Sequence, residues 1–226
     1  MFDAASSEQT LLGELVFFGG PMDSGKSTLA LQMAYTQSAH DRKGRLFTSQ
    51  DRSGQPHITS RIGLERAAIE VDADFNFWTY VQAERVRGGR VDFLICDEAQ
   101  FYTTEQINQL AQVVDDFGID VFCFGIMCDF RTQMFPGSKR LVELADRIES
   151  LPVRPLCWCG RIGTHNARVI NGLMVTEGDQ VLVGDTGSDT LDEVHYEVLC
   201  RVHHRAKQPK GSSGATLSAQ TLFESE

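Results

Sequence analysis

Residues 20–27 have the types and the spacing needed to bind phosphate. Their sequence is Gly-Pro-Met-Asp-Ser-Gly-Lys-Ser, a glycine followed by four residues and then Gly-Lys-Ser. Because glycine has no Cβ, backbone N–H groups can come close to phosphate oxygens. In such a loop Lys26 reaches the β- and γ-phosphates, and the hydroxyl of Ser27 binds Mg²⁺. The pattern predicts a nucleoside triphosphate site formed by Gly20, Pro21, Met22, Asp23, Ser24, Gly25, Lys26 and Ser27.

An acidic pair, Asp97 and Glu98, lies at the carboxyl end of a predicted apolar strand, 91–97. Open α/β sheets bind their ligands at this end of the strands. Asp97 is therefore expected to hold hydrated Mg²⁺ opposite Ser27, with Glu98 as acceptor of the proton of an attacking hydroxyl or water. The alternative is that the pair only caps the helix that follows. The phosphate loop in the same chain favours the metal–nucleotide site.

Two close pairs of metal-ligating residues occur later in the chain. Cys157 and Cys159 form the first pair, and Cys200 and His203 form the second. Three thiolates and one imidazole predict a tetrahedral zinc site, which is structural because the protein fills all four positions. His204 is an alternative to His203, and unrelated free thiols are the alternative to a metal site. The other histidines lack a paired partner nearby and are expected to be surface or hydrogen-bonding residues: His40, His57, His165 and His195.

Strands and helices alternate along the part of the chain that must position these groups. Strands are predicted at 15–18, 45–48, 91–97 and 120–126. Helices are predicted from the phosphate loop to about His40, over 103–117, and over 138–148 with Ser138 as N-cap and with Leu141, Leu144, Ala145 and Ile148 buried. Apolar strands separated by helices are typical of a parallel sheet covered on both faces. The predicted fold class is α/β, a P-loop NTPase sheet with a small zinc-ribbon-like β domain.

The composition and patterning of the sequence change twice along the chain. After about residue 150 short β-like runs alternate with Gly, Asp and Thr, and the last residues are polar and unpatterned. We therefore expect a nucleotide-binding domain over 14–150 and a zinc-binding domain over 151–206. An N-terminal extension over 1–13 and a disordered tail over 207–226 complete the predicted organisation.

Composition narrows the range of partners. The 226 residues carry a formal net charge of −10, which argues against a role built on the phosphate backbone of nucleic acid and favours a free nucleoside or nucleotide. No apolar stretch is long enough to span a bilayer, and the N-terminus lacks the features of a signal peptide, so a cytoplasmic protein without membrane partners is expected. Three further cysteines follow or lie in apolar runs and are expected to be buried, reduced thiols: Cys96, Cys123 and Cys128.

Taken together, these motifs resemble those of the type II thymidine kinases, a tetrameric class with a zinc-binding lasso domain. The match covers most of residues 15–203. Beyond the phosphate loop it rests on Ser-Arg-Ile-Gly-Leu at 60–64, Asp-Glu-Ala-Gln-Phe at 97–101, Asp-Phe-Arg at 129–131, Phe-Pro-Gly-Ser-Lys-Arg at 135–140, and Tyr-Glu at 196–197 before Cys-Arg at 200–201. The resemblance implies transfer of the γ-phosphate of ATP to the 5′-hydroxyl of thymidine, and also of deoxyuridine, for DNA precursor salvage. It further implies a homotetramer and feedback inhibition by thymidine triphosphate.

The resemblance also implies roles for individual residues. Glu98 matches the general base, while Asp97 and Gln100 join the phosphate loop at the ATP–Mg²⁺ site. The positions that match the nucleoside pocket of the family are Met22, Phe101, Ile126, Phe130 and Tyr196. Structural Zn²⁺ would be held by the four ligands already named. Lys26, Mg²⁺ and either Arg52 or Arg61 would offset the charge on the transferred group.

The chain departs from the family pattern at three places. Alignment on Arg52 puts Gln50 where the family has an Asp, with Asp51 one position later. Asn166 stands where the family has a Thr in the lasso, and the glycine-rich stretch at 184–190 is longer than in the family. Two rival functions fit parts of the pattern: a P-loop ATPase acting on nucleic acid, and a zinc-ribbon interaction module that only senses nucleotide.

Overall fold

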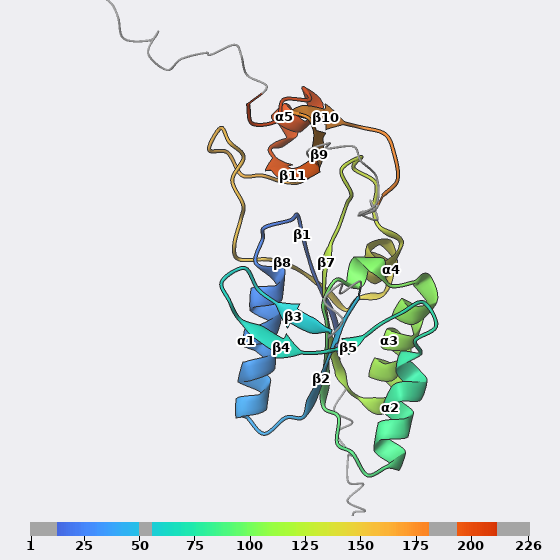
Figure 1. The fold of residues 1–226 in the computed structure, drawn as a ribbon. Coiled ribbons are helices and arrows are strands. Elements are labelled where there is room, and N and C mark those ends of the chain that lie inside the picture. Colours follow the sequence, from blue (N-terminus) through green and yellow to red (C-terminus); the bar gives the residue numbers. More distant parts are fainter. Residues whose placement is uncertain (1–12, 50–55, 181–193, 212–226) are drawn as a thin grey trace, which may run out of the picture. The chain divides into compact units, whose positions relative to one another are not determined.

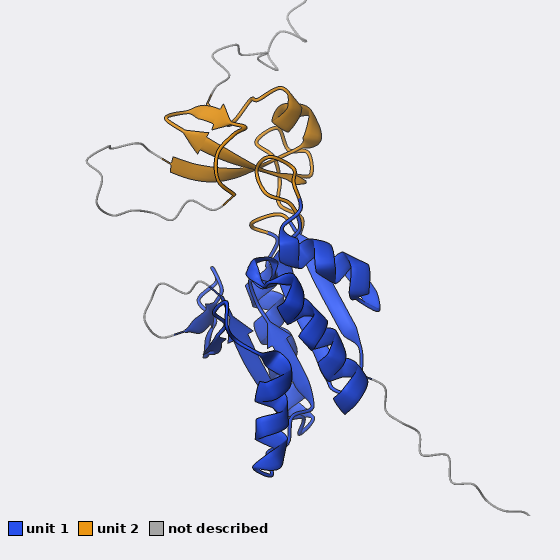
Figure 2. Ribbon diagram, turned by 90° about the vertical axis from the view of Figure 1, so that its right-hand side faces the viewer, with its two compact units in different colours: residues 1–20, 24–127, 134–153 blue, residues 21–23, 128–133, 154–226 orange. Residues whose placement is uncertain are grey.

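The computed structural model describes residues 13–49, 56–180 and 194–211. The predicted extension 1–13 and tail 207–226 therefore lie outside the described residues, except for Gly13 and 207–211. The same holds for Gln50, Asp51, Arg52 and the stretch 184–190. The chain forms two compact units, coloured in Figure 2: unit 1 comprises 1–20, 24–127 and 134–153, and unit 2 comprises 21–23, 128–133 and 154–226.

Unit 1 is built on a parallel sheet of six strands in the order β5-β2-β6-β7-β1-β8, drawn in Figure 1. The strands are β1 (Leu15–Gly20), β2 (Gly44–Thr48), β5 (Ile69–Glu70), β6 (Phe93–Cys96), β7 (Asp120–Ile126) and β8 (Arg147–Ser150). Every pairing between neighbours in this sheet is parallel. The central strands are buried on both faces, which explains their near-continuous apolar sequence. The predicted α/β class is confirmed.

Helices cover both faces of this sheet (Figure 1). They are α1 (Lys26–Ala39), α2 (Phe77–Val86), α3 (Thr104–Phe117) and α4 (Pro136–Leu144). Helix α3 begins with a capping box. The Thr103 side chain accepts from the Gln106 N–H, and the Gln106 side chain accepts from the Thr103 N–H. The helix ends at Gly118, whose φ of 63° is the left-handed conformation that glycine adopts most readily.

Each face of the sheet has its own apolar core. On one face α1 and the hairpin of β3 (His57–Thr59) and β4 (Glu65–Ala67) pack against side chains that include Val16, Ile95 and Phe124. On the other face α2, α3 and α4 pack against alternate residues of the same strands, such as Phe17 and Leu94. Because β1, β6 and β7 are paired in parallel, their carboxyl ends lie at the same edge of the sheet.

The prediction of a helix over 138–148 is wrong in its bounds. The helix begins at Pro136, whose ring pre-sets the helical φ, and the N-cap is Phe135 rather than Ser138. It ends at Leu144, and β8 follows as an edge strand parallel to β1. Ile148 is therefore in a strand and is 48% exposed instead of buried in a helix. The helix α2, the hairpin β3–β4 and strand β5 were also not predicted.

Unit 2 contains a small antiparallel sheet in the order β10-β9-β11. Its elements are β9 (His165–Ile170), β10 (Leu173–Val175), β11 (Val194–Leu199) and the short helix α5 (Arg201–Arg205). A compact core contains two of the predicted zinc ligands, Cys157 and Cys200, together with Ala167, Met174 and Leu199. Because this core is small, a metal ion would add considerable stability.

The three cysteines outside the proposed zinc site differ in burial. Cys96 and Cys123 are fully buried, as predicted, whereas Cys128 is only partly buried. Within the part of the chain that the structure describes, no helix has the length and apolar character required to cross a membrane.

Candidate active site and metal site

The phosphate loop follows β1 directly and leads into α1. Gly25 is the residue before the helix and has a φ of 77°, which a side chain would strain. At Gly20 an added Cβ would lie 2.8 Å from the Leu151 Cδ1 and 2.9 Å from the Ser24 Oγ, so a side chain there would have to displace these two neighbours. Lys26 is buried, with its Nζ 3.5 Å from the Ser24 Oγ. A buried ammonium at the start of a helix is well suited to a phosphate group.

The middle of the loop, Pro21–Asp23, belongs to unit 2. There the backbone N–H of Met22 donates to the Asn166 Oδ1 at 2.8 Å. The Asn166 Nδ2 in turn donates to the Cys128 carbonyl at 2.9 Å. The Asn166 amide therefore joins the backbone of Met22, in the phosphate loop, to the backbone of Cys128. Its oxygen is the acceptor in one hydrogen bond and its nitrogen is the donor in the other.

Asp97 follows β6 and is 3% exposed. Among the described residues its Oδ1 has no hydrogen-bond partner, although the atom is buried. Burial, and then the negative charge of Glu98, raise the pKa of Asp97 to about 6, while the Ser27 hydroxyl and Lys26 act in the opposite direction. A buried carboxylate oxygen without a partner, beside a serine hydroxyl, is a hard-oxygen donor set of the kind that Mg²⁺ prefers. These residues fit the predicted metal.

Glu98 opens the 3₁₀ turn η1 (Ala99–Phe101) and has a φ of 53°. A non-glycine residue in this left-handed region is uncommon and is often found at functional sites. The carboxylate Oε2 of Glu98 accepts a hydrogen bond from the Gln100 Nε2. Gln100 itself is 1% exposed, and its Oε1 accepts from the backbone N–H of Ile126 at 3.0 Å.

The five predicted nucleoside-pocket residues fall into two groups. Phe101 and Ile126 belong to unit 1, and Met22, Phe130 and Tyr196 belong to unit 2. In unit 1, Phe101 lies edge-on to Phe135, with ring centroids 5.7 Å apart.

The residue that links Phe130 to Tyr196 was missed from sequence. It is Arg168, which is 2% exposed. Its guanidinium carbon lies 3.9 Å from the centroid of the Phe130 ring, and its Nε donates to the Tyr196 Oη at 2.8 Å. The signal available in the sequence was an arginine inside the otherwise apolar run that follows Asn166. Phe130 is buried in this cluster and Tyr196 is 38% exposed, so the tyrosine ring is the aromatic face that could contact a flat base.

The four predicted zinc ligands come together in unit 2. Their ligand atoms, from Cys157, Cys159, Cys200 and His203, all lie within 4.8 Å of one another. The His203 Nδ1 is 3.3 Å from the Cys157 Sγ and 3.6 Å from the Cys200 Sγ. Three sulfurs and one nitrogen at these separations are a donor set that fits tetrahedral zinc.

The alternative ligand, His204, does not join this cluster. Its Nε2 lies 3.1 Å from the Phe130 carbonyl oxygen. No other histidine among the described residues joins a metal-ligating group either. A backbone N–H bond from His203 lowers the pKa of the Cys200 thiol, which favours the thiolate that a metal requires.

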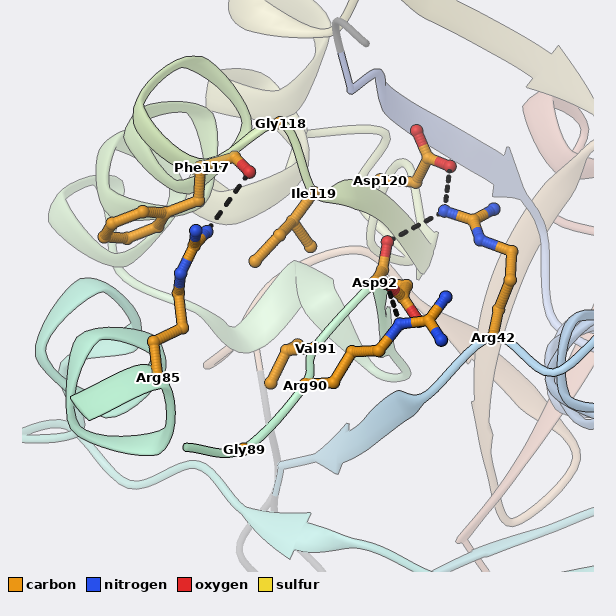
Figure 3. A pocket seen from close by; sticks show the side chains of 10 residues that line it. All are labelled: Arg42, Arg85, Gly89, Arg90, Val91, Asp92, Phe117, Gly118, Ile119 and Asp120. Carbon is orange, nitrogen blue, oxygen red and sulfur yellow. Dashed lines mark hydrogen bonds and ion pairs between the residues drawn. The ribbon is translucent and has the colours of Figure 1, made fainter. Parts of the chain in front are cut away.

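A separate cavity of about 790 Å³ lies at the opposite edge of the sheet in unit 1 (Figure 3). Its lining includes residues at the amino ends of β6 and β7, such as Asp92 and Asp120, whereas Asp97 and Glu98 follow the carboxyl end of β6. Figure 3 shows Arg42 pointing toward Asp120, to which its guanidinium donates at 2.7 Å. The same guanidinium donates to the Asp92 carbonyl at 2.8 Å. The arginine joins the starts of two strands, which is a structural role.

Comparisons with known proteins agree with the family that the sequence motifs resemble. The family profile described as "Thymidine kinase" matches residues 13–204. A protein named thymidine kinase from Cutibacterium acnes is 62% identical over 211 residues, which cover 93% of this chain and 97% of that relative. One with the same name from Streptomyces avermitilis is 54% identical over 92% of this chain and 97% of its own length. A thymidine kinase from Legionella pneumophila is 34% identical over 95% of this chain and 98% of its own. The chain belongs to the thymidine kinase family.

Proposed function

We propose that this protein transfers the γ-phosphate of ATP to the 5′-hydroxyl of thymidine. The observation that carries the proposal is a combination of three residues within unit 1. Lys26 of the phosphate loop is buried, the buried Oδ1 of Asp97 has no hydrogen-bond partner in the part of the chain that the structure describes, and Glu98 is adjacent to it. The names of the relatives supply the substrate, thymidine. Deoxyuridine, which differs from thymidine only at the 5-methyl group, is the proposed second substrate.

The nucleotide site is proposed to consist of residues 20–27 with Asp97. Lys26 neutralises charge on the β- and γ-phosphates. Ser27 and Asp97 would hold Mg²⁺, which when bound offsets negative charge on the phosphoryl oxygens. Positioning and charge neutralisation account for most of the catalysis in phosphoryl transfer, because the protein has little covalent chemistry to perform.

Glu98 is the proposed general base. It accepts the proton of the 5′-hydroxyl as that oxygen forms its bond to the γ-phosphorus. The bond from this phosphorus to the oxygen that bridges it to the β-phosphate breaks, and ADP leaves with that oxygen. The products are thymidine monophosphate and ADP, and the proton resides on Glu98 until it is released to solvent.

The nucleoside is proposed to contact the five pocket residues named above. Apolar side chains suit a flat base with a 5-methyl group, and backbone N–H and C=O groups would read its polar edge. The zinc held by three cysteines and His203 is proposed to be structural. We also retain a kinase domain over 14–150, a lasso domain over 151–206, a homotetramer in the cytoplasm, and feedback inhibition by thymidine triphosphate as parts of this proposal.

A coupled assay of ADP release tests the proposal. Purified protein is given Mg-ATP with each of four deoxynucleosides, and a reaction without nucleoside measures bare ATP hydrolysis. Selective turnover with thymidine is expected. ATP hydrolysis that is independent of nucleoside and rises with DNA would replace the proposal with the nucleic-acid ATPase function.

A further inference from the structure

The side-chain amide of Gln100 is engaged at both ends. Its Nε2 donates to the Glu98 carboxylate, and its Oε1 accepts from the Ile126 N–H at 3.0 Å. Gln100 is 1% exposed, so leaving its amide without these partners would be costly. The amide thus connects the proposed base to the end of the central strand β7.

A second side chain, that of Ser138, binds the backbone of Ile126 at the end of β7. The Ser138 Oγ, in the first turn of α4, donates to the Ile126 carbonyl at 2.6 Å. Gln100 and Ser138 therefore bind the N–H and the C=O of one residue. Gly125, next to it, permits the approach, because a Cβ there would lie 3.0 Å from the Gln100 Oε1 and 3.1 Å from the Gln100 backbone nitrogen.

The turn that carries Gln100 is also fixed in place. An added Cβ on Gly137 would lie 2.5 Å from the Ala99 carbonyl oxygen and 2.8 Å from that of Tyr102. The backbone of α4 thus rests directly on the turn that follows Glu98. Strand β7, helix α4 and the turn form a rigid frame, and the Gln100 amide is the group that connects this frame to the Glu98 carboxylate.

We infer that Gln100 is a positioning residue that holds the Glu98 carboxylate ready to accept the hydroxyl proton, rather than a residue that binds ATP. The inference rests on the proposed function, in which Glu98 is the base. A glutamate side chain has three rotatable bonds, and fixing Oε2 removes most of that freedom. The contact leaves Oε1 for the substrate proton. A misplacement of about 1 Å can lower a rate roughly 100-fold, so the frame is expected to act on kcat.

The first experiment compares two buried glutamines. Gln100→Met removes both amide contacts at nearly constant volume. Gln106→Met is the matched control: Gln106 is 3% exposed, and its amide donates to the carbonyls of Asp72 and Phe75 at 2.7 and 3.1 Å, away from Glu98. We expect Gln100→Met to lower kcat by about 10- to 100-fold with the KM for ATP within about twofold. Gln106→Met is expected to lower the melting temperature but to retain kcat. Gln100→Asn, whose amide is too short for both contacts, gives the same test if the methionine variant does not fold.

A double-mutant cycle separates positioning from a general structural effect. If Gln100 acts through Glu98, adding Gln100→Met to Glu98→Gln should lower the remaining rate by less than about twofold. A full additional loss would overturn the inference, as would a raised KM for ATP with kcat retained. Near-normal turnover of Glu98→Gln alone would instead remove Glu98 from its proposed role. The failure of the proposed function and the failure of this inference therefore give different results.

Discussion

The indole of Trp158 stacks on the imidazole of His203, with ring centroids 4.1 Å apart and 14° between the planes. The Trp158 Nε1 donates to the Gln208 carbonyl at 3.0 Å, which fixes the indole. The stack sets the plane of a ring whose Nδ1 points into the cysteine cluster. The residue between the first two cysteines therefore orients the ligand of the second pair, a contact that the spacing of the cysteines does not reveal.

Replacing Trp158 by alanine is expected to weaken zinc binding about 10-fold, because outer-shell partners that orient a ligand typically contribute 10- to 100-fold. Competition with a chromogenic chelator measures the affinity. The chain has one other tryptophan, Trp78, whose Nε1 bonds to Asp116 in unit 1. Trp78→Ala is the matched control and should leave zinc affinity unchanged. Equal zinc affinities for the two variants would contradict the orienting role of the stack.

Two adjacent histidines give a second test of the metal site. His203→Asn removes a ligand atom and should lower zinc affinity by more than the roughly 100-fold of an outer-shell change. His204→Asn removes only the contact with the Phe130 carbonyl and should retain one zinc per chain. Zinc content after dialysis against chelator distinguishes the two. Loss of zinc from the His204 variant alone would identify His204 as the ligand.

The parts that could be predicted from sequence are those carried by short motifs with recognisable chemistry, even where two motifs meet only in the fold, as the pair Cys157–Cys159 meets Cys200 and His203. The phosphate loop is contiguous, and β7 was predicted with its observed bounds because its apolar residues are continuous. The helix α2 was missed because its first residues, Phe-Trp-Thr-Tyr-Val, favour strands. Packing and the Asn76 cap override that preference: the Asn76 side chain accepts from the Thr79 N–H at 2.8 Å. Strand β8 was missed because it is a largely polar strand at the edge of the sheet, next to β1.

The parts of the site that could not be predicted depend on contacts between distant residues. Gln100 meets Ile126 across 26 positions, and Arg168 meets Phe130 across 38 positions. No local pattern encodes such pairs. The residues of the motif Asp-Glu-Ala-Gln could be assigned to the site, but the bond from Gln100 to Glu98 requires the turn conformation, with its positive φ at Glu98.

Arg168 gives a prediction about the nucleoside. Lysine at this position keeps the charge but cannot stack a planar guanidinium on Phe130 while also bonding to the Tyr196 Oη. Arg168→Lys should raise the KM for thymidine about 10-fold, with the KM for ATP unchanged. Arg161→Lys, an exposed change in unit 2, serves as control. Steady-state kinetics with each substrate varied in turn give the comparison. A rise in both KM values together would instead indicate a general loss of structure.

Asp97 predicts a dependence of stability on pH in the absence of Mg²⁺. Its pKa is about 6 in the folded protein, above its ordinary 3.8, chiefly because burial disfavours the charged form. The folded state therefore binds this proton more tightly than the unfolded state. The carboxylate should cost no stability below about pH 4, an increasing amount as the pH rises to about 6, and a constant amount above it.

The variant Asp97→Asn removes the buried charge and should abolish this part of the pH dependence. In metal-free buffer it is expected to be more stable than the wild type by up to about 3 kcal/mol near pH 8, and equally stable near pH 4. Urea unfolding at the two pH values measures the difference. Adding Mg²⁺ with a nucleotide should stabilise the wild type but not the variant, because only the wild type offers the buried carboxylate oxygen to the ion. Equal stabilisation of both proteins would mean that Asp97 is not the metal ligand.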